Sequence, residues 1–304
     1  MGACWSLCSQ RRGRAALHEP RKRGFSGNAL TPLGNELPAV VHAELAPEEI
    51  GDGRVIIIGD VHGCPNELKA LLEKCAYEDG RDTVVLVGDL VNKGPEPLQV
   101  VRYARQTGMR SVRGNHDEAA LAAHRAWLKG TPAEKQYGWF LEATPEDIAY
   151  LAELPFSLSL PSHGVLVVHA GLVPGVPLQR QSLHDLIEVR AVGRQGQGWT
   201  ALPKFPRNAG GPWAEAWQGP RHVIFGHHAR RRLQTCRFAT GIDTGCVLGD
   251  QLTAVVLPRL ADLAARGFRP AAALHAGGEG VTLAALGAEL VSVPAARVYA
   301  GNDK

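Results

Sequence analysis

From residue 51 onwards, short apolar runs alternate with stretches in which apolar residues recur at helical spacing. This alternation is typical of an α/β domain. The runs 55–58 and 84–87 are continuous and aliphatic, as expected of strands that are covered on both faces. Between them, Pro65 and a helical pattern of Leu and Cys residues up to position 75 predict an amphipathic helix. The domain therefore opens with a strand, a helix and a second strand.

Later elements follow the same two patterns. Helices are predicted at about 95–107, 116–129, 144–154 and 182–190, and strands at about 156–160, 165–169, 223–225, 236–242, 252–257 and 290–293. The Ala- and Gly-rich residues 259–287 predict a variable surface insertion. Residues 51–304 are thus expected to form one domain that contains this insertion.

Residues 191–221 show little helix or strand signal, and loops of this length are usually functional or disordered. They carry Trp199, Trp213 and Trp217 together with the cationic residues Arg194, Lys204 and Arg207. One hypothesis is that a nucleotide base stacks on an indole while the cations bind phosphates. The alternative is that Trp213 and Trp217 pack beneath the next strand, because tryptophans often serve as core residues. The pattern favours exposure only for Trp199.

The first 50 residues predict a separate, flexible leader, because they are rich in Gly, Pro, Ser and Arg and lack periodicity. Gly2 and Ser6 fit the N-myristoylation pattern, and Cys4 and Cys8 could carry palmitate. Acylation, together with the nearby arginines, would attach a cytoplasmic protein to a membrane surface. A basic presequence of the mitochondrial type is the alternative.

Charge and cysteine content narrow the class of protein. Residues 1–24 contain six basic residues and one acidic residue, so they carry +5 and leave −2 for the rest of a chain of net charge +3. A slightly acidic body argues against a DNA-binding protein.

No apolar run approaches the roughly 20 residues of a membrane-spanning helix. The 6 cysteines form no CxxC pair, which favours a reducing, cytoplasmic compartment; nothing indicates the oligomeric state.

Polar blocks follow several of the predicted strands at their carboxyl ends. The blocks are GDVHG (59–63), GDLVNKGP (88–95), RGNHD (113–117), HAG (169–171) and GHH (226–228). In an open α/β sheet the carboxyl ends of the strands converge on one crevice, so these side chains should meet there. A single block of this kind is usually only a turn. The whole series, in order and at strand ends, predicts an active-site crevice.

The side chains in these blocks are of metal-ligating types. They offer carboxylate, imidazole or amide groups and no thiolate: Asp60, His62, Asp89, Asn115, His169 and His227. Such ligands suit Mn, Fe or Zn rather than a sulfur-rich structural zinc site. They are too many for one catalytic ion, which must keep a coordination position open. We therefore expect two divalent ions that share one carboxylate, an arrangement that activates a bridging water for attack on phosphorus.

The series GDVHG, GDLVNKGP, GNHD, HAG and GH resembles the calcineurin-like metallophosphoesterases of the phosphoprotein phosphatase superfamily. The longer segments VVHAGLVPGVPLQRQ and TGIDTGC are similar to its ApaH-like phosphatase branch. The resemblance covers about residues 53–258 and implies an α/β fold, a β-sandwich flanked by helices in four αββα layers. It also implies two divalent metal ions, with Mn favoured over Fe or Zn. The implied substrates are dinucleoside polyphosphates, nucleotides or capped RNA 5′ ends.

The resemblance also implies a role for each residue of the blocks. It makes Asp60 and His62 ligands of the first metal, Asp89 the bridge, and Asn115, His169 and His227 ligands of the second. His116 matches the residue that protonates the leaving group, and Lys93, Arg113 and Arg190 match phosphate-binding positions. Ala229 stands where related enzymes have a further His, so the first metal should have fewer protein ligands and more solvent.

One position departs from the protein phosphatases of this superfamily, which have Asp-Arg in place of Asn92-Lys93. The amide oxygen of Asn92 is expected to orient the His116 ring, but it cannot supply the negative charge that would help the ring keep its proton. Weaker protonation suits a phosphoanhydride, because the phosphate that leaves needs little help. We therefore predict an ApaH-like phosphoanhydride hydrolase. The alternatives are a Ser/Thr protein phosphatase and a catalytically silent binding module.

Overall fold

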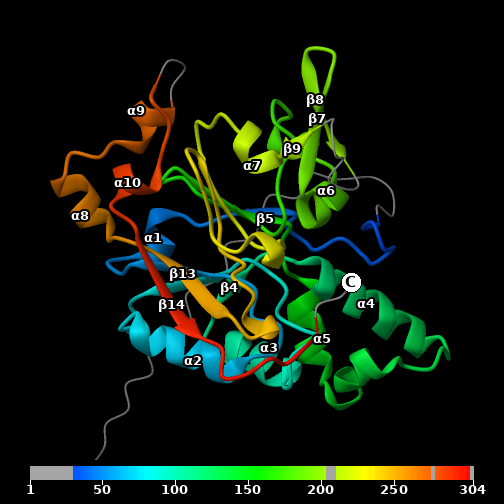
Figure 1. The fold of residues 1–304 in the computed structure, drawn as a ribbon. Coiled ribbons are helices and arrows are strands. Elements are labelled where there is room, and N and C mark those ends of the chain that lie inside the picture. Colours follow the sequence, from blue (N-terminus) through cyan, green and yellow to red (C-terminus); the bar gives the residue numbers. More distant parts are fainter. Residues whose placement is uncertain (1–29, 203–209, 275–277, 302–304) are drawn as a thin grey trace, which may run out of the picture.

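The computed structural model describes residues 30–202, 210–274 and 278–301. Two mixed sheets lie face to face, and helices cover their outer faces, as Figure 1 shows. The sequence of layers is helices, five-stranded sheet, six-stranded sheet, and helices with a small third sheet. The predicted αββα sandwich is confirmed.

The five-stranded sheet contains the first strands that the apolar pattern predicted. In spatial order it consists of β14 (Glu289–Pro294), β13 (Gln251–Leu257), β2 (Val55–Ile58), β3 (Thr83–Leu86) and β4 (Arg110–Ser111). Strands β2, β3 and β4 run parallel, whereas β13 pairs antiparallel with both β2 and β14. The parallel strands therefore end at the same edge of the sheet.

The six-stranded sheet forms the second inner layer. Its spatial order is β1 (His42–Glu44), β5 (Ser157–Leu160), β6 (Val165–Val168), β10 (His222–Phe225), β12 (Ala239–Gly241) and β11 (Gln234–Cys236). Strands β6, β10 and β12 are parallel neighbours, so their carboxyl ends also lie together. The predicted strand 236–242 is a hairpin of β11 and β12 instead.

Strand β2 shows how the sandwich is held together. Val55 and Ile57 belong to the core between the two sheets, whereas Ile56 and Ile58 belong to the core beneath helices. All of them are 0% exposed. A strand buried on both faces can be continuously apolar, which explains why the run that opens the domain has no alternation.

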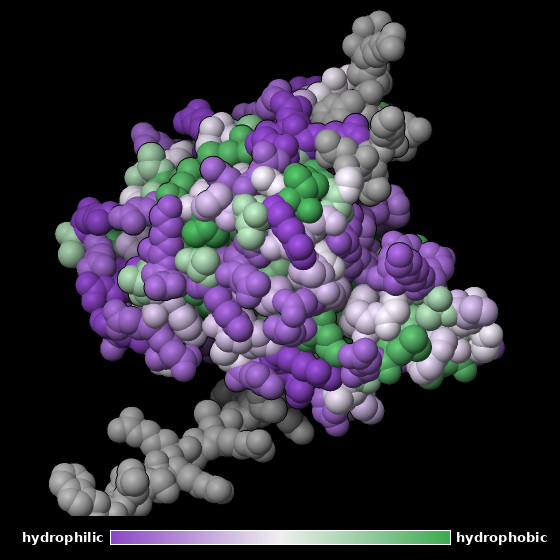
Figure 2. All heavy atoms as spheres, turned by 60° about the horizontal axis from the view of Figure 1, so that its bottom comes forward, coloured by the Kyte–Doolittle hydropathy of each residue, from purple (hydrophilic) through white to green (hydrophobic). Residues whose placement is uncertain are grey.

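Helices α2 (Pro65–Lys74) and α3 (Pro97–Gln106) cover the outer face of the five-stranded sheet. The remaining helices are α1 (Pro47–Ile50), α4 (Asn115–Leu128), α5 (Pro145–Ala152), α6 (Leu183–Glu188), α7 (Trp213–Ala216), α8 (Leu260–Ala265), α9 (Pro270–Leu274) and α10 (Leu283–Leu286). Short 3₁₀ helices span Lys135–Glu142, Leu178–Arg180, Ala229–Arg231 and Cys246–Leu248. Figure 2 shows the face around α2 and α3, where hydrophilic side chains predominate and hydrophobic ones are scattered. Among the described residues, no helix combines the length and apolarity that crossing a bilayer requires.

The predicted boundary at residue 50 differs from the structure, because residues 30–50 are part of the domain. Strand β1 pairs in parallel with β5, with His42 opposite Ser157. Asn35 is buried and its side-chain amide donates to the main-chain oxygen of Glu118 over 2.9 Å. The sequence concealed this because β1 is only 3 residues long, too short to show a sustained period. The rest of the predicted leader, with Gly2, Cys4 and Cys8, lies outside the described residues.

Two other segments also differ from expectation. Residues 191–221 contain a small sheet, β8 (Gly198–Leu202), β7 (Ala191–Gln195) and β9 (Gly211–Pro212), followed by α7. Residues 259–287 are not merely a surface insertion, since Leu263, Val281 and Leu286 are buried in the core between the sheets. Their Ala and Gly content masked three short helices whose few large side chains close that core.

Candidate metal centre

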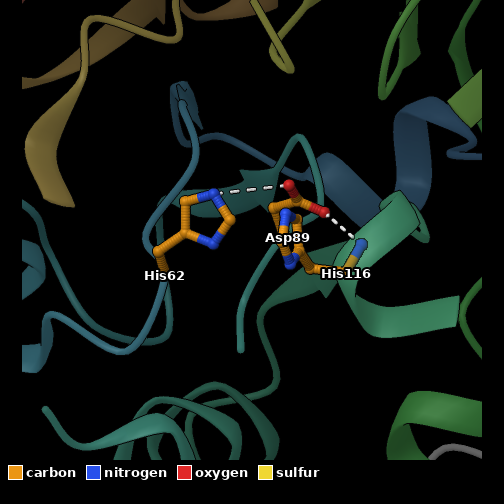
Figure 3. A group of neighbouring side chains, drawn as sticks. All are labelled: His62, Asp89 and His116. Carbon is orange, nitrogen blue, oxygen red and sulfur yellow. Dashed lines mark hydrogen bonds and ion pairs between the residues drawn. The ribbon is translucent and has the colours of Figure 1, made fainter. Parts of the chain in front are cut away.

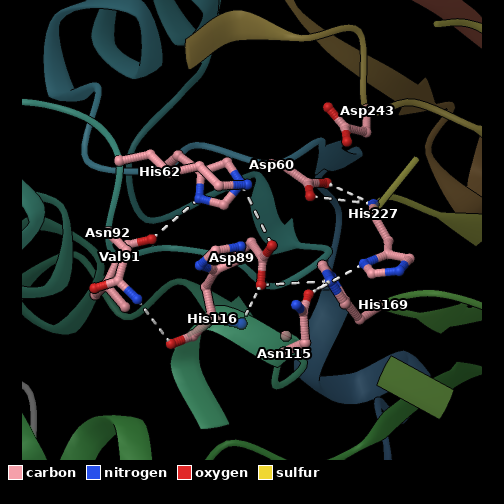
Figure 4. A network of polar contacts seen from close by, with 12 residues as sticks. Asp60, His62, Asp89, Val91, Asn92, Asn115, His116, His169, His227 and Asp243 are labelled. Atoms are coloured by element: carbon pink, nitrogen blue, oxygen red, sulfur yellow. Dashed lines mark hydrogen bonds and ion pairs between the residues drawn. The ribbon is translucent and has the colours of Figure 1, made fainter. Parts of the chain in front are cut away.

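The predicted polar blocks meet at one place, where the carboxyl ends of strands from both sheets converge. Asp60 follows β2, Asp89 follows β3, His169 follows β6 and His227 follows β10. Asn115 is the first residue of α4, which begins after the short strand β4. Figure 4 shows these side chains pointing toward one another from separate segments of the chain. The crevice predicted from strand ends is present.

Asp89 lies between two halves of this cluster. Its Oδ2 is 3.4 Å from Nε2 of His62, and its Oδ1 is 3.4 Å from Nε2 of His169. The carboxylate is buried and also accepts a 2.9 Å hydrogen bond from the main-chain N–H of His116. Asp89 therefore has one oxygen toward each half, the position in which a shared ligand would be found.

The half beyond Asp89 Oδ1 contains an amide and two imidazoles. Asn115 Oδ1 lies 3.0 Å from Nε2 of His169 and 3.1 Å from Nδ1 of His227. The other ring nitrogen of His169 is 2.9 Å from the main-chain oxygen of Val87, which fixes its orientation. Such an outer hydrogen bond is the usual support of a metal-ligating histidine.

Asp60 and His62 form the other half, beneath the same crevice. The Asp60 carboxylate accepts from the main-chain N–H of His227, at 3.1 and 3.2 Å to its two oxygens. His62 Nδ1 lies 3.1 Å from the main-chain oxygen of Val91, so its Nε2 is directed toward Asp89. Asp60, His62 and His169 are thus each held by a main-chain contact that leaves another donor atom facing the crevice.

The backbone at three of these residues is in the left-handed region, which is uncommon for residues other than glycine. The φ angles are 44° at His62, 53° at Asp89 and 69° at His227. Conformations of this kind cost of order 1–3 kcal/mol each and are concentrated at functional sites. The fold accepts this cost where it directs side chains into the crevice.

Two glycines beside the cluster are required by close packing. A Cβ at Gly114 would lie 2.1 Å from Oδ1 of Asp89, and a Cβ at Gly226 would lie 2.0 Å from Oδ1 of Asp60. Both distances are far below van der Waals contact. The carboxylates therefore pack directly against bare backbone, which explains the Gly residues of the RGNHD and GHH blocks.

The electrostatics of the cluster fit divalent cations. Burial, together with the negative charges of Asp243 and Asp89, raises the pKa of Asp60 well above its ordinary value. Burial lowers the pKa of His62 to about 3. Nε2 of His227 is buried without a hydrogen-bond partner. A divalent cation would relieve the repulsion between these carboxylates and binds imidazole in its neutral form, and the oxygen and nitrogen donors suit Mn, Fe or Zn.

His116 lies beside this cluster, as Figure 3 shows. Its ring centroid is 4.9 Å from that of His62, with the two rings nearly perpendicular. A nitrogen of His116, a nitrogen of His62 and an oxygen of Asp89 all lie within 4.8 Å of one another. The ring is half-buried at the pocket wall, where it can meet a bound substrate.

Asn92 contacts His116 in a different way from the one expected. Its Nδ2 donates to the main-chain oxygen of His116 over 3.2 Å, and its Oδ1 accepts from Nε1 of Trp139 over 3.0 Å. The amide oxygen expected to orient the His116 ring is therefore engaged by an indole. Asn92 positions the backbone of His116, and the expectation that it acts on the ring is corrected.

Of the three predicted phosphate-binding cations, two line the pocket and one does not. Lys93 and Arg190 are exposed side chains at the pocket wall. Arg113 is 0% exposed, and its Nη1 pairs with Oε2 of the equally buried Glu118 at 3.0 Å. Its guanidinium also lies 5.1 Å from the ring of Phe156. Arg113 thus forms an ion pair with Glu118 in the core, so its assignment to substrate binding is wrong.

Three further residues, whose roles the sequence did not predict, belong to the centre. Asp243 lines the pocket, and burial, with the charge of Asp89, raises its pKa to about 6. Asp117 accepts from the main-chain N–H groups of Asp89, Leu90 and Gly114 at 2.9 Å each, so it holds two of the blocks together.

Asp243 follows β12, so the strand-end rule could have found it. Trp139 lies in a 3₁₀ helix that carries no comparable signal.

Trp213, in residues 191–221, packs beneath β10, as the packing alternative predicted. Nε1 of Trp213 donates to the main-chain oxygen of Ala170 over 2.9 Å, and its ring lies 4.8 Å from that of Phe225 on β10. Trp199 is half-buried, with the Arg194 guanidinium 4.0 Å from its ring centroid. Lys204 and Arg207 lie outside the described residues.

Comparison with known proteins decides the family. The sequence profile of the calcineurin-like phosphoesterases matches residues 53–241, which is more than half of the chain. The chain belongs to the calcineurin-like phosphoesterase family. The predicted membership and the prediction of a hydrolase are thereby confirmed, and the family is one that uses divalent metal ions.

The relatives also support the predicted branch. The chain is 41% identical to a symmetrical bis(5′-nucleosyl)-tetraphosphatase of Hamiltonella defensa over 59% of this chain and 66% of that protein, just under two thirds of its length. A crystal structure described as that of a candidate diadenosine tetraphosphatase has 34% identity and a TM-score of 0.67, covering 84% of this chain and 98% of the other. A serine/threonine-protein phosphatase 1 of Salmonella typhimurium is 32% identical over 66% of this chain and 89% of that protein. The prediction of an ApaH-like phosphohydrolase is confirmed.

Proposed function

We propose that this phosphohydrolase cleaves a phosphoanhydride bond of dinucleoside polyphosphates at a centre for two divalent cations. The proposal rests on the position of Asp89, whose two oxygens each lie 3.4 Å from a histidine of a different half of the cluster. Asp60 and His62 would hold one cation, and Asn115, His169 and His227 the other, with Asp89 shared. Manganese is the favoured metal, with iron or zinc as alternatives, since the donor set contains no thiolate.

The cations, when bound, would supply Lewis-acid activation of water and of the phosphoryl group. The chain itself supplies the remaining groups. The positively charged Lys93 and Arg190 at the pocket wall would bind and orient the negatively charged phosphates. His116 would donate a proton to the oxygen of the leaving phosphate. Asn92 would fix the position of His116 through its main-chain oxygen.

The relatives support a particular substrate class. Several related proteins are named as symmetrical bis(5′-nucleosyl)-tetraphosphatases, and one of Bacillus subtilis that is 27% identical is named as asymmetrical. We propose the symmetrical reaction, in which a bis(5′-nucleosyl) tetraphosphate yields two nucleoside diphosphates. Capped RNA 5′ ends are proposed as a second substrate, because they contain the same type of anhydride bond.

One assay tests this assignment. The purified full-length chain with manganese would be given diadenosine tetraphosphate, a capped RNA and a serine phosphopeptide in parallel. We expect hydrolysis of the tetraphosphate to ADP and slower or no release of phosphate from the phosphopeptide. Preferential dephosphorylation of the phosphopeptide would support the protein phosphatase instead. Release of ATP and AMP would show an asymmetrical enzyme.

We also propose that the protein is cytoplasmic and is attached to a membrane surface by acylation of Gly2, with Cys4 or Cys8 as a second site. The pattern of the first residues supports this, although these residues lie outside the described part of the chain. Replacing Gly2 by Ala should move the protein from the membrane to the soluble fraction. Import of the unchanged chain into mitochondria would support the alternative presequence.

A further inference from the structure

A second group of potential metal ligands lies outside the catalytic cluster. It consists of the two thiols of Cys64 and Cys246 and the carboxylate of Glu67. A ligand atom from each of these residues lies within 4.8 Å of the other two. The residues are 0%, 2% and 4% exposed for Cys64, Cys246 and Glu67 respectively. Neither cysteine forms a disulfide, and both lie in the core beneath α2.

Glu67 is held in a way that leaves one oxygen unused. Its Oε1 accepts from the hydroxyl of Tyr299 over 2.7 Å and from the main-chain N–H of Ala296 over 3.0 Å. Its Oε2 is buried with no hydrogen-bond partner. Leaving a buried acceptor without a partner is destabilising, and more so for a charged group. Such an oxygen beside two thiols needs a positive partner, and none of the described cations pairs with it.

We propose that Cys64, Cys246 and Glu67 bind a zinc ion that is separate from the catalytic cations. Two thiolates and one carboxylate are ligands that zinc accepts at a tetrahedral site, with a small ligand such as water in the fourth position. Thiolates also discriminate between the two sites, because soft sulfur favours zinc over manganese, whereas the catalytic cluster offers only oxygen and nitrogen. The hydrogen bonds from Tyr299 and Ala296 would orient Glu67 as outer contacts orient a ligating carboxylate.

The place of this site gives it a structural function. Cys64 is two residues after His62, and Cys246 is three residues after Asp243. Glu67 lies in the first turn of α2 and contacts the segment after β14. A bound ion would therefore join two loops that carry residues of the catalytic cluster to the carboxyl-terminal segment.

Binding requires the release of two protons. Sγ of Cys64 lies 3.7 Å from the main-chain oxygen of His62, as a thiol donor would. A hydrogen bond with Cys64, together with burial, raises the pKa of the Cys246 thiol. The balanced step takes up Zn²⁺, forms two sulfur–zinc bonds and releases both thiol protons to solvent. No oxidant is involved, and uptake should weaken as the pH falls.

Cobalt substitution tests the site without reference to activity. Metal-free full-length protein would be titrated with Co²⁺ and followed by absorption. A thiolate ligand gives an intense near-ultraviolet charge-transfer band, which the oxygen and nitrogen ligands of the catalytic cluster do not. We expect this band in the wild type, its loss in Cys246→Ala and in Cys64→Ala, and its displacement by Zn²⁺. Zinc-loaded wild type should retain a zinc equivalent on dialysis that both variants lack.

Cys75→Ala is the matched control, because Cys75 is also buried in the core beneath α2 but has no place in the ligand group. This variant should keep the band and the zinc. Absence of the band in wild-type protein would overturn the proposal whether or not the variants fold. If the thiols of Cys64 and Cys246 in the metal-free protein reacted only after reduction, the proposal would be overturned in favour of a disulfide. A Co²⁺ band that persists in both cysteine variants would show that other ligands bind the ion, which would also overturn the proposal.

Discussion

Nε1 of Trp139 donates a 3.0 Å hydrogen bond to Oδ1 of Asn92, whose Nδ2 in turn donates to the main-chain oxygen of His116 over 3.2 Å. The indole therefore determines which way the Asn92 amide faces. Asn92 is 1% exposed, so neither end of the amide can exchange its partner for bulk water. The hydrogen bonds from Trp139 through Asn92 therefore support the first turn of α4, which carries the proposed proton donor.

Replacing Asn92 by Asp should therefore be harmful, although Asp is the residue of related protein phosphatases at this position. A carboxylate would place an acceptor against the main-chain oxygen of His116, where the structure has a donor. We expect the free energy of unfolding to fall by about 1–3 kcal/mol, the cost of an unsatisfied buried group. Urea denaturation would measure it, and hydrolysis of both anhydride and monoester should decrease. A gain in phosphomonoester activity would show that the side chain acts on the His116 ring after all.

Replacing Asp89 by Asn should remove the shared ligand. We expect the affinity for divalent metal to fall by more than the roughly 10- to 100-fold that is typical of residues that only support a ligand. Metal content after dialysis, measured by elemental analysis, would test this, and turnover should decrease in parallel. Asp79→Asn, at an exposed position, is the control and should retain its metal. An Asp89→Asn protein with full metal content would contradict the shared position.

Replacing His116 by Ala should separate proton transfer from metal binding. Turnover should fall by roughly 10² to 10⁴, the range for the loss of a general acid, while metal content stays unchanged. His124→Ala is a control from the same helix, because His124 packs against Trp127 and Phe140 away from the pocket. If His116→Ala turned over substrate at the wild-type rate, His116 would have no part in the reaction.

The two arginines assigned to phosphate should behave in opposite ways. Arg113→Met leaves Glu118 buried without its cation, so the free energy of unfolding should fall by about 3–5 kcal/mol. Arg190→Ala should leave stability unchanged and raise KM about tenfold or more, since a hydrogen bond to a charged group contributes about 1.5–3 kcal/mol. Urea denaturation and steady-state kinetics on the two variants would show both effects. An increase in KM without loss of stability in Arg113→Met would restore its role in substrate binding.

The stability of the metal-free protein should depend on the state of His222. Burial lowers the pKa of His222 from 6.5 to about 4, and its Nε2 is 2.9 Å from Oγ1 of Thr240. Because the unfolded chain takes up the proton first, stability is lost as the pH falls from about 6.5 to about 4. Each pKa unit corresponds to about 1.4 kcal/mol, so the loss due to this residue is roughly 3 kcal/mol.

Urea denaturation at about pH 7 and about pH 4, with a chelator present, would measure this dependence. The variant His222→Gln keeps a polar contact to Thr240 and cannot take up the proton. Its loss of stability over this range should be smaller than that of the wild type. Other buried histidines, such as His62, affect both proteins equally. An identical dependence in the two proteins would contradict the assignment to His222.

Much of the fold could be predicted because the apolar pattern is strong where strands are buried on both faces. The continuous aliphatic runs 55–58 and 84–87 were predicted as strands on this ground, and they correspond to β2 and β3. The helix predicted at about 144–154 corresponds to α5, whose N-cap is Thr144. The ligand cluster could be predicted for a related reason, since strand ends converge whatever the loops between them contain.

The failures share a physical cause. Arg113 lies directly before Gly114 in a polar block, and sequence position does not indicate which way a side chain turns at the end of a strand. Its guanidinium faces Glu118, a buried carboxylate that forms no other ion pair among the described residues. Trp139 and residues 30–50 depend on contacts between segments far apart in the chain. Local patterns carry no information about such contacts.

The bare backbone beside the two carboxylates limits how this enzyme can change in evolution. A single methyl group at Gly114 or Gly226 would collide with a carboxylate oxygen, so the floor of the crevice allows no stepwise variation. The wall is different, because Lys93 and Arg190 line the pocket with exposed side chains and Ala229 with a half-buried one. New substrate preferences should therefore arise by exchange of these wall residues, while Gly114 and Gly226 stay the same whatever the substrate.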